Sequence, residues 1–103
     1  MSIENENQSK MDNKEKRELY KKALEKYGVM PQVLMVVEEC GELLSALSKY
    51  NRSRIEVPEV ITELADVSIM VEQMAELLGY EEFVKEKNRK LERLKERLSC
   101  LNF

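Results

Sequence analysis

The stretch VVEECGELLSAL, residues 36–47, guides the interpretation of the whole chain. Its apolar residues recur every three or four positions, which predicts an amphipathic helix. Glu38, Glu39 and Glu42 lie within five positions of that helix, and no Lys or Arg occurs between residues 27 and 48. The sequence therefore concentrates negative charge on one helix and supplies no basic neighbour to pair with it.

The same periodicity recurs along the chain and predicts an all-α fold. Nothing is typical of a strand, because the β-branched residues recur at helical spacing. Four helices are expected, at residues 13–27, 31–50, 58–78 and 81–98.

Glycine and proline mark the expected helix boundaries. Gly28 and Gly79 follow the first and third helices, and Pro31 and Pro58 begin the second and third. Glycine after a helix and proline in its first turn are typical of such boundaries. We expect residues 1–12 to be a disordered polar tail and residues 13–103 to form one all-α domain.

Composition excludes several classes of protein. Histidine is absent and the two cysteines are far apart, so neither a usual zinc site nor a disulfide framework is expected. No apolar run approaches the ~20 residues of a membrane span, and the polar N-terminus does not resemble a secretory signal. We expect a cytoplasmic protein that binds neither membranes nor nucleic acid.

The helix at residues 31–50 has one apolar stripe with the glutamates on the opposite side. Taken alone, that opposite side is interpreted as a solvated acidic face. Cys40 lies on the apolar stripe and is expected to be a buried, reduced thiol. The stripe consists of Val33, Val36, Val37, Cys40, Leu43, Leu44 and Leu47.

The helix at residues 58–78 is apolar on two nearly opposite sides. Four helices in one small chain can hardly cover both sides, so we expect a homodimer or a tetramer. One stripe holds Val60, Leu64, Val67, Met70, Val71, Met74 and Leu78, and the other holds Ile61, Ala65 and Ile69.

Glu63 lies inside the first of these stripes and Asp66 borders it. Residues 55–84 contain eight acidic residues and no basic one, so neither carboxylate has a partner nearby in the sequence. Residues three apart on a helix are neighbours, so Glu39 with Glu42, and Glu63 with Asp66, each present two carboxylates together. Two adjacent helices carrying such pairs predict an all-oxygen site that favours Mg²⁺ or Mn²⁺. Ion pairs with basic residues of the last helix are the alternative.

These two motifs resemble a known family. E-E-C-G-E at residues 38–42, followed after 20 residues by E-L-A-D at 63–66, is similar to the E-E-x-x-E … E-x-x-D signature of MazG-like nucleotide pyrophosphohydrolases. These enzymes belong to the all-α NTP pyrophosphatase superfamily. The resemblance extends over roughly residues 30–97, with little of it in the tail and the first helix.

The resemblance implies an activity and a set of site residues. Family members cleave a nucleoside triphosphate or deoxynucleoside triphosphate to the monophosphate and pyrophosphate, and Mg²⁺ is held by the motif carboxylates. By position, the metal ligands would be Glu39, Glu42, Glu63 and Asp66. Glu38 would be a further ligand or would orient the attacking water, so Glu38 and Glu39 are the catalytic candidates. A role in clearing unwanted nucleotides from the cellular pool is expected.

Positive charge for the substrate phosphates is expected from outside the motifs. Lys90 and Arg93 are one turn apart on the last helix, in a pattern that resembles the corresponding region of the family. Lys49 and Arg52 are further candidates, and a solvated, salt-bridged helix face is the alternative for the last helix.

Two other functions remain open on the sequence. The chain could be a non-catalytic helical module that pairs through its two-sided helix, with the acids in surface and cross-helix ion pairs. It could also be a regulatory domain that binds a nucleotide and a metal without hydrolysis.

Overall fold

The computed structural model describes residues 10–100, and this part of the chain forms four helices and no strand. The all-α prediction is confirmed, and every helix begins and ends within two residues of its predicted bounds. Residues 1–9 of the predicted tail lie outside the described part. The helices are α2 (Asn13–Tyr27), α3 (Val29–Asn51), α4 (Val57–Leu78) and α5 (Tyr80–Cys100).

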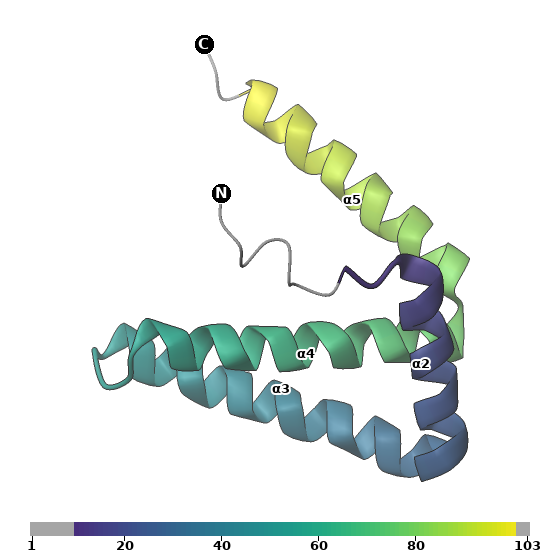
Figure 1. Ribbon diagram of the computed structural model, residues 1–103. Helices are drawn as coiled ribbons and strands as arrows, with labels where there is room; N and C mark the ends of the chain where they lie inside the picture. Colours follow the sequence, from purple (N-terminus) through teal and green to yellow (C-terminus); the bar gives the residue numbers. More distant parts are fainter. Residues whose placement is uncertain (1–9, 101–103) are drawn as a thin grey trace.

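Helices α3 and α4 form an antiparallel hairpin joined by residues 52–56 (Figure 1). Helix α2 crosses the hairpin at the end opposite this connection, and α5 starts there and runs away from the hairpin (Figure 1). A single residue separates α2 from α3 and α4 from α5. These residues are Gly28 and Gly79, with φ of 91° and 146°, a backbone region that side chains with a Cβ rarely adopt.

Hydrogen bonds between side chains connect α2 to α4. Tyr20 is buried, and its hydroxyl donates a hydrogen bond to Glu72. Arg17 donates two hydrogen bonds to Glu76, at 2.6 and 3.2 Å. These contacts hold α2 across one side of α4.

The core of the described residues is small. Its buried apolar residues are Tyr20, Ala46, Val60 and Ala75, and no large side chain within residues 10–100 is fully buried. Residues 10–100 also contain no helix long and apolar enough to span a membrane.

Helix α3 turns only part of its predicted apolar stripe inward, where Val33, Val36, Cys40 and Leu43 are half-buried. Gln32 and Ala46 are its buried residues, whereas Val37 and Leu44 are 65% and 70% exposed. Glu39 is half-buried on the inward side of α3. The prediction that the glutamates of this helix form a solvated acidic face is therefore wrong for Glu39. Cys40 is a free thiol, as predicted, but it is half-buried and not fully buried.

Helix α4 contacts the chain's own α2 on one side. Ala65 and Ile69 of the second apolar side line a groove beside α2, but both stay exposed, Ile69 by 49%, so α2 does not cover them. A further exposed apolar surface combines the outer sides of α3 and α4. We call it the α3–α4 outer face, and its exposed members are Met30, Leu34, Val37, Leu44, Leu47, Val57, Ile61, Leu64, Val71 and Leu78.

Candidate metal centre

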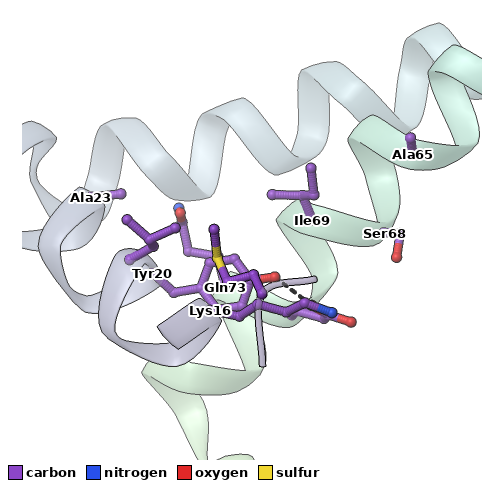
Figure 2. A pocket seen from close by; sticks show the side chains of 10 residues that line it. Lys16, Tyr20, Ala23, Ala65, Ser68, Ile69 and Gln73 are labelled. Carbon is purple, nitrogen blue, oxygen red and sulfur yellow. Dashed lines mark hydrogen bonds between the residues drawn. The ribbon is translucent and has the colours of Figure 1, made fainter. Parts of the chain in front are cut away.

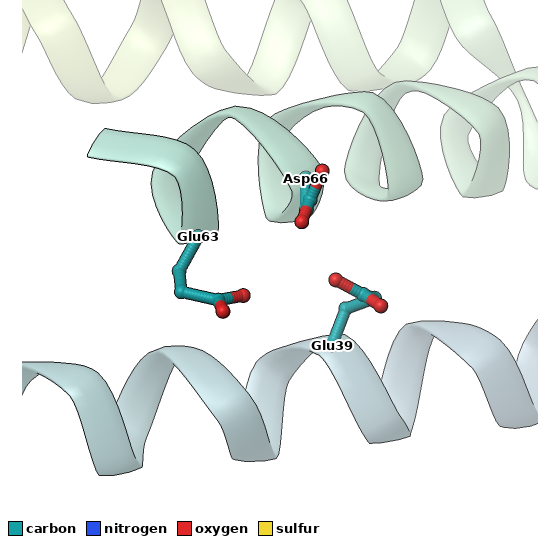
Figure 3. Close-up of side chains that lie close together, drawn as sticks. All are labelled: Glu39, Glu63 and Asp66. Carbon is teal, nitrogen blue, oxygen red and sulfur yellow. The ribbon is translucent and has the colours of Figure 1, made fainter. Parts of the chain in front are cut away.

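Three of the predicted carboxylates converge between α3 and α4. Glu39 extends from α3 toward Glu63 and Asp66 of α4, as Figure 3 shows. One oxygen from each of the three lies within 4.8 Å of the others. This carboxylate trio could hold a metal ion, and a donor set of oxygens alone suits Mg²⁺ or Mn²⁺.

The helical spacing produces this convergence. Glu63 and Asp66 are one turn apart, so both side chains leave α4 on the side that faces α3. Glu39 lies on the inward side of α3. Glu39 and Glu63 are half-buried and Asp66 is exposed, so the trio is open to solvent along one edge.

No ion pair within residues 10–100 reaches the trio. Glu39 Oε2 and Glu63 Oε1 are buried without a hydrogen-bond partner among these residues. The ion pairs of the same part of the chain join Arg17 and Lys21 to acids of α4 and α5, or Arg89 and Lys90 to Glu86, and none reaches the trio.

Burial and repulsion both act on Glu39. Burial raises the pKa of Glu39 above its ordinary value, and the charges of Glu42, Asp66, Glu63 and Glu38 raise it further, in that order. Without a bound cation, the negative charge of Glu39 is therefore unfavourable. A cation beside Glu39 would offset the repulsion from the neighbouring carboxylates.

Glu42 and Glu38 lie outside the trio. Glu42 lines a hollow of about 200 Å³ that it shares with Glu63 and Lys49. Glu38 is exposed on α3. Both are close enough to act on Glu39 electrostatically, and their roles as ligand or water-orienting residue remain predictions.

The candidates for phosphate contact are separated by the fold. Lys49 lines the hollow that adjoins the trio. Helix α5 packs on α4, and its first turn shares a hollow with Val36 of α3. Lys90 and Arg93 lie further along α5 and do not line that hollow. Lys90 lies 3.8 Å from Glu86 of its own helix. Within one chain, Lys49 is therefore the candidate that lies beside the carboxylates.

Glu59 is a residue of this region that the sequence interpretation missed. Its side chain accepts a hydrogen bond of 3.1 Å from the Glu56 backbone N–H at the start of α4, and it also lines the hollow. Glu59 precedes Glu63 by four residues, which also makes the two neighbours on one helix face, so helical spacing could have identified it.

The largest hollow of the described residues lies elsewhere, between α2 and α4. Its volume is about 620 Å³, and Figure 2 shows Tyr20 and Ile69 among the side chains that line it. The carboxylate trio is not part of its lining. Size alone therefore does not identify the site, and the chemistry of the trio does.

Comparisons of this chain with protein-family models, with curated proteins and with solved structures give no match. The comparisons assign no family, and the finding that stands is an all-α protein with four helices in its described residues.

Proposed function

We propose that this protein is a Mg²⁺-dependent nucleoside triphosphate pyrophosphohydrolase of the MazG-like type, which cleaves (d)NTP to (d)NMP and pyrophosphate. The observation that carries the proposal is the carboxylate trio, whose buried oxygens lack hydrogen-bond partners among residues 10–100. Leaving buried carboxylate oxygens unpaired is costly, so such groups normally meet a proton, a base or a metal ion.

The residues of the trio would hold the cation, and the neighbouring hollow would receive part of the substrate. When bound, Mg²⁺ supplies positive charge that neutralises phosphate oxygens and polarises the phosphorus under attack. Glu38 and Glu42 are next in reach, to orient water or to add a ligand. Lys49 would contact phosphate from the hollow, where a cation beside anionic oxygens is favourable.

The proposal includes a homodimer. The α3–α4 outer face exposes large apolar side chains along both helices of the hairpin, and Leu44 and Leu78 are 70% and 77% exposed. Contiguous apolar surface of this kind is typical of interfaces. Pairing would also bring a second copy of α5, with Lys90 and Arg93, to the assembly.

The exposed face also favours a second candidate, a non-catalytic module that pairs through these helices. Such a module has no use for a cluster of unpaired carboxylates at half-buried positions. It would gain stability if a Lys or Arg replaced one of them. The trio therefore supports the enzyme over the module.

Pyrophosphate release measured over canonical and modified NTPs and dNTPs, with Mg²⁺ or Mn²⁺, tests the proposal. We expect release from at least one nucleotide, with loss of activity in Glu39→Gln and Asp66→Asn and an unchanged helical circular dichroism spectrum. An absence of release from every nucleotide with either metal would overturn the enzymatic assignment. Unchanged activity in both variants would remove the trio from the mechanism.

A further inference from the structure

Two glutamines are buried side by side between the helices that carry the trio. Gln32 of α3 is 7% exposed and Gln73 of α4 is 3% exposed. Gln73 Nε2 donates a hydrogen bond to Gln32 Oε1 at 2.5 Å. In a core with so few buried residues, placing two amides there instead of two apolar side chains calls for an explanation.

This amide pair is the one side-chain hydrogen bond that joins α3 to α4 among residues 10–100. The other polar side-chain contacts of α4 with another helix in this part of the chain lead to α2, through Tyr20, Arg17 and Lys21. They fix α4 against a different helix, so they do not determine which side of α4 faces α3.

The amide pair and the trio share one register. Glu39 follows Gln32 by seven residues in α3, and Asp66 precedes Gln73 by seven residues in α4. Because the helices are antiparallel, the two steps run in the same direction and end opposite each other, about 10 Å away along the hairpin. The connection at residues 52–56 closes the hairpin on the far side of the trio, so the trio lies between the loop and the amide pair.

The trio does not hold this alignment by itself. Three carboxylates without an ion-pair partner among the described residues repel one another and favour a separation or rotation of the helices. Apolar contacts between α3 and α4 are not directional, so they tolerate small rotations and shifts. A hydrogen bond between two buried amides has a narrow geometry, and a buried polar pair is a known means of fixing helix register.

We propose that Gln32 and Gln73 are a positioning pair, whose hydrogen bond fixes the rotation and register of α4 against α3 so that Glu39, Glu63 and Asp66 converge on one cation. The inference rests on the proposed metal site. The amide pair would align the three carboxylates before a cation binds, although neither glutamine contacts the cation.

The test measures binding of Mn²⁺ alone, without nucleotide, by electron paramagnetic resonance. The variant is Gln32→Leu with Gln73→Leu, which removes both amides and leaves neither one unpaired. We expect Mn²⁺ to bind at least about tenfold more weakly, the range seen when groups that orient metal ligands are lost, while the helical circular dichroism spectrum remains. If this variant does not fold, Gln32→Met with Gln73→Met, which is closer in shape, is measured in its place.

Two further variants separate positioning from general stability. Tyr20→Phe removes a contact of α4 with α2 and is expected to keep the wild-type Mn²⁺ affinity. Gln32→Glu keeps an acceptor for Gln73 Nε2 and is expected to retain Mn²⁺ binding close to that of the wild type, unlike the leucine pair.

The outcomes distinguish this inference from the proposed function. Equal Mn²⁺ affinity in the wild type and the leucine pair would overturn the positioning role and leave the metal site intact. Equal loss in Tyr20→Phe would also overturn it, because the effect would then be one of general stability. If the wild type itself binds no Mn²⁺, the metal site and the positioning role both fail.

Discussion

Arg17 of α2 holds Glu76 of α4 through two hydrogen bonds, at 2.6 and 3.2 Å, and the Glu76 side chain is only 4% exposed. Glu63 and Asp66 lie nearer the N-terminal end of α4 than Glu76 does. Neither has such a partner among residues 10–100. The fold therefore pairs a buried carboxylate where α2 crosses and leaves others unpaired where α3 and α4 face each other. The pKa of Glu76 is accordingly lowered, whereas the pKa of Glu39, which faces Glu63 and Asp66 from α3, is raised.

The paired carboxylate predicts a loss of stability in acid. The hydrogen bonds from Arg17 lower the pKa of Glu76 below its ordinary value of 4.5. A lowered pKa contributes stability above the unfolded value, and this contribution is lost as the pH falls from about 4.5 through the folded value. Arg17→Gln should therefore lower the melting temperature at pH 7, and its difference from the wild type should shrink below about pH 4.5.

Arg89→Gln is the matched control for that experiment, because Arg89 pairs with Glu86 on the exposed surface of α5. Exposed pairs contribute little to stability, so this variant should melt close to the wild type at every pH. A difference between Arg17→Gln and the wild type that stays constant down to pH 3 would contradict the role of Glu76.

Glu39, which has no ion-pair partner among residues 10–100, should affect stability in the opposite direction from Glu76. Burial, with the surrounding acids, raises the pKa of Glu39, so ionised Glu39 destabilises the fold at pH 7. This destabilisation disappears as the pH falls through the raised folded value toward 4.5. Glu39→Gln should therefore raise the melting temperature of the metal-free protein at pH 7, with a gain that diminishes toward pH 4.5. Glu38→Gln, at an exposed position, should give a smaller gain, and a lower melting temperature for Glu39→Gln would contradict the prediction.

Bound metal should raise the melting temperature of the wild type above that of Glu39→Gln, the reverse of the order expected without metal. A cation that binds only the folded state adds about 2.7 kcal/mol when its concentration is 100 times its Kd. For a domain of this size that corresponds to a rise in melting temperature of roughly 10–20 °C. Mg²⁺ or Mn²⁺ should therefore stabilise the wild type strongly and Glu39→Gln or Asp66→Asn weakly, as measured by thermal melting in chelator and in excess metal. Equal shifts in all three proteins would place the metal elsewhere.

The sequence predicts the helices well because their signals are local. Apolar spacing and the residues Gly28, Pro58 and Gly79 suffice to place every helix within two residues of its observed bounds. The motif spacing also predicts that Glu39, Glu42, Glu63 and Asp66 meet, and all of these except Glu42 lie in the trio. The helix boundaries and the pairing of Glu63 with Asp66 depend on residues within a turn or two, whose geometry a helix determines by itself. The approach of Glu39 to that pair depends instead on how α3 packs against α4.

The sequence predicts less well which side of each helix faces inward. On α3 the predicted apolar stripe faces inward only in part. Val36 and Leu43 are half-buried beside Gln32 and Ala46, whereas Val37 and Leu44 are exposed. Periodicity gives the direction of apolar residues but does not say whether another helix of the same chain or a second molecule covers them. The Gln32–Gln73 pair has no local signal either, because 41 residues separate its members.

Lys49 is the basic residue that the fold places best for the proposed reaction. It shares the 200 Å³ hollow with Glu42 and Glu63, whereas Lys90 and Arg93 lie on α5. We expect Lys49→Ala to raise KM for the nucleotide about tenfold or more, since a charge-assisted hydrogen bond to phosphate contributes about 1.5–3 kcal/mol. Lys22→Ala, an exposed lysine of α2, is the control in steady-state kinetics. If Lys49→Ala leaves KM unchanged while Lys90→Ala or Arg93→Ala raises it, a partner's α5 supplies the phosphate contact.

The α3–α4 outer face predicts self-association. Val37, Leu44 and Ile61 are among its most exposed members, and burying such side chains contributes about 25 cal/mol per Å² of apolar surface. Leu44→Lys would place a charge in the middle of that contact, so it should shift the protein from dimer to monomer in sedimentation velocity at micromolar concentration. Tyr27→Lys also replaces an exposed apolar side chain but lies on α2, outside the outer face, and should leave the dimer intact. A wild-type protein that sediments as a 12.1 kDa monomer would contradict the prediction, because the apolar face would then be exposed in solution.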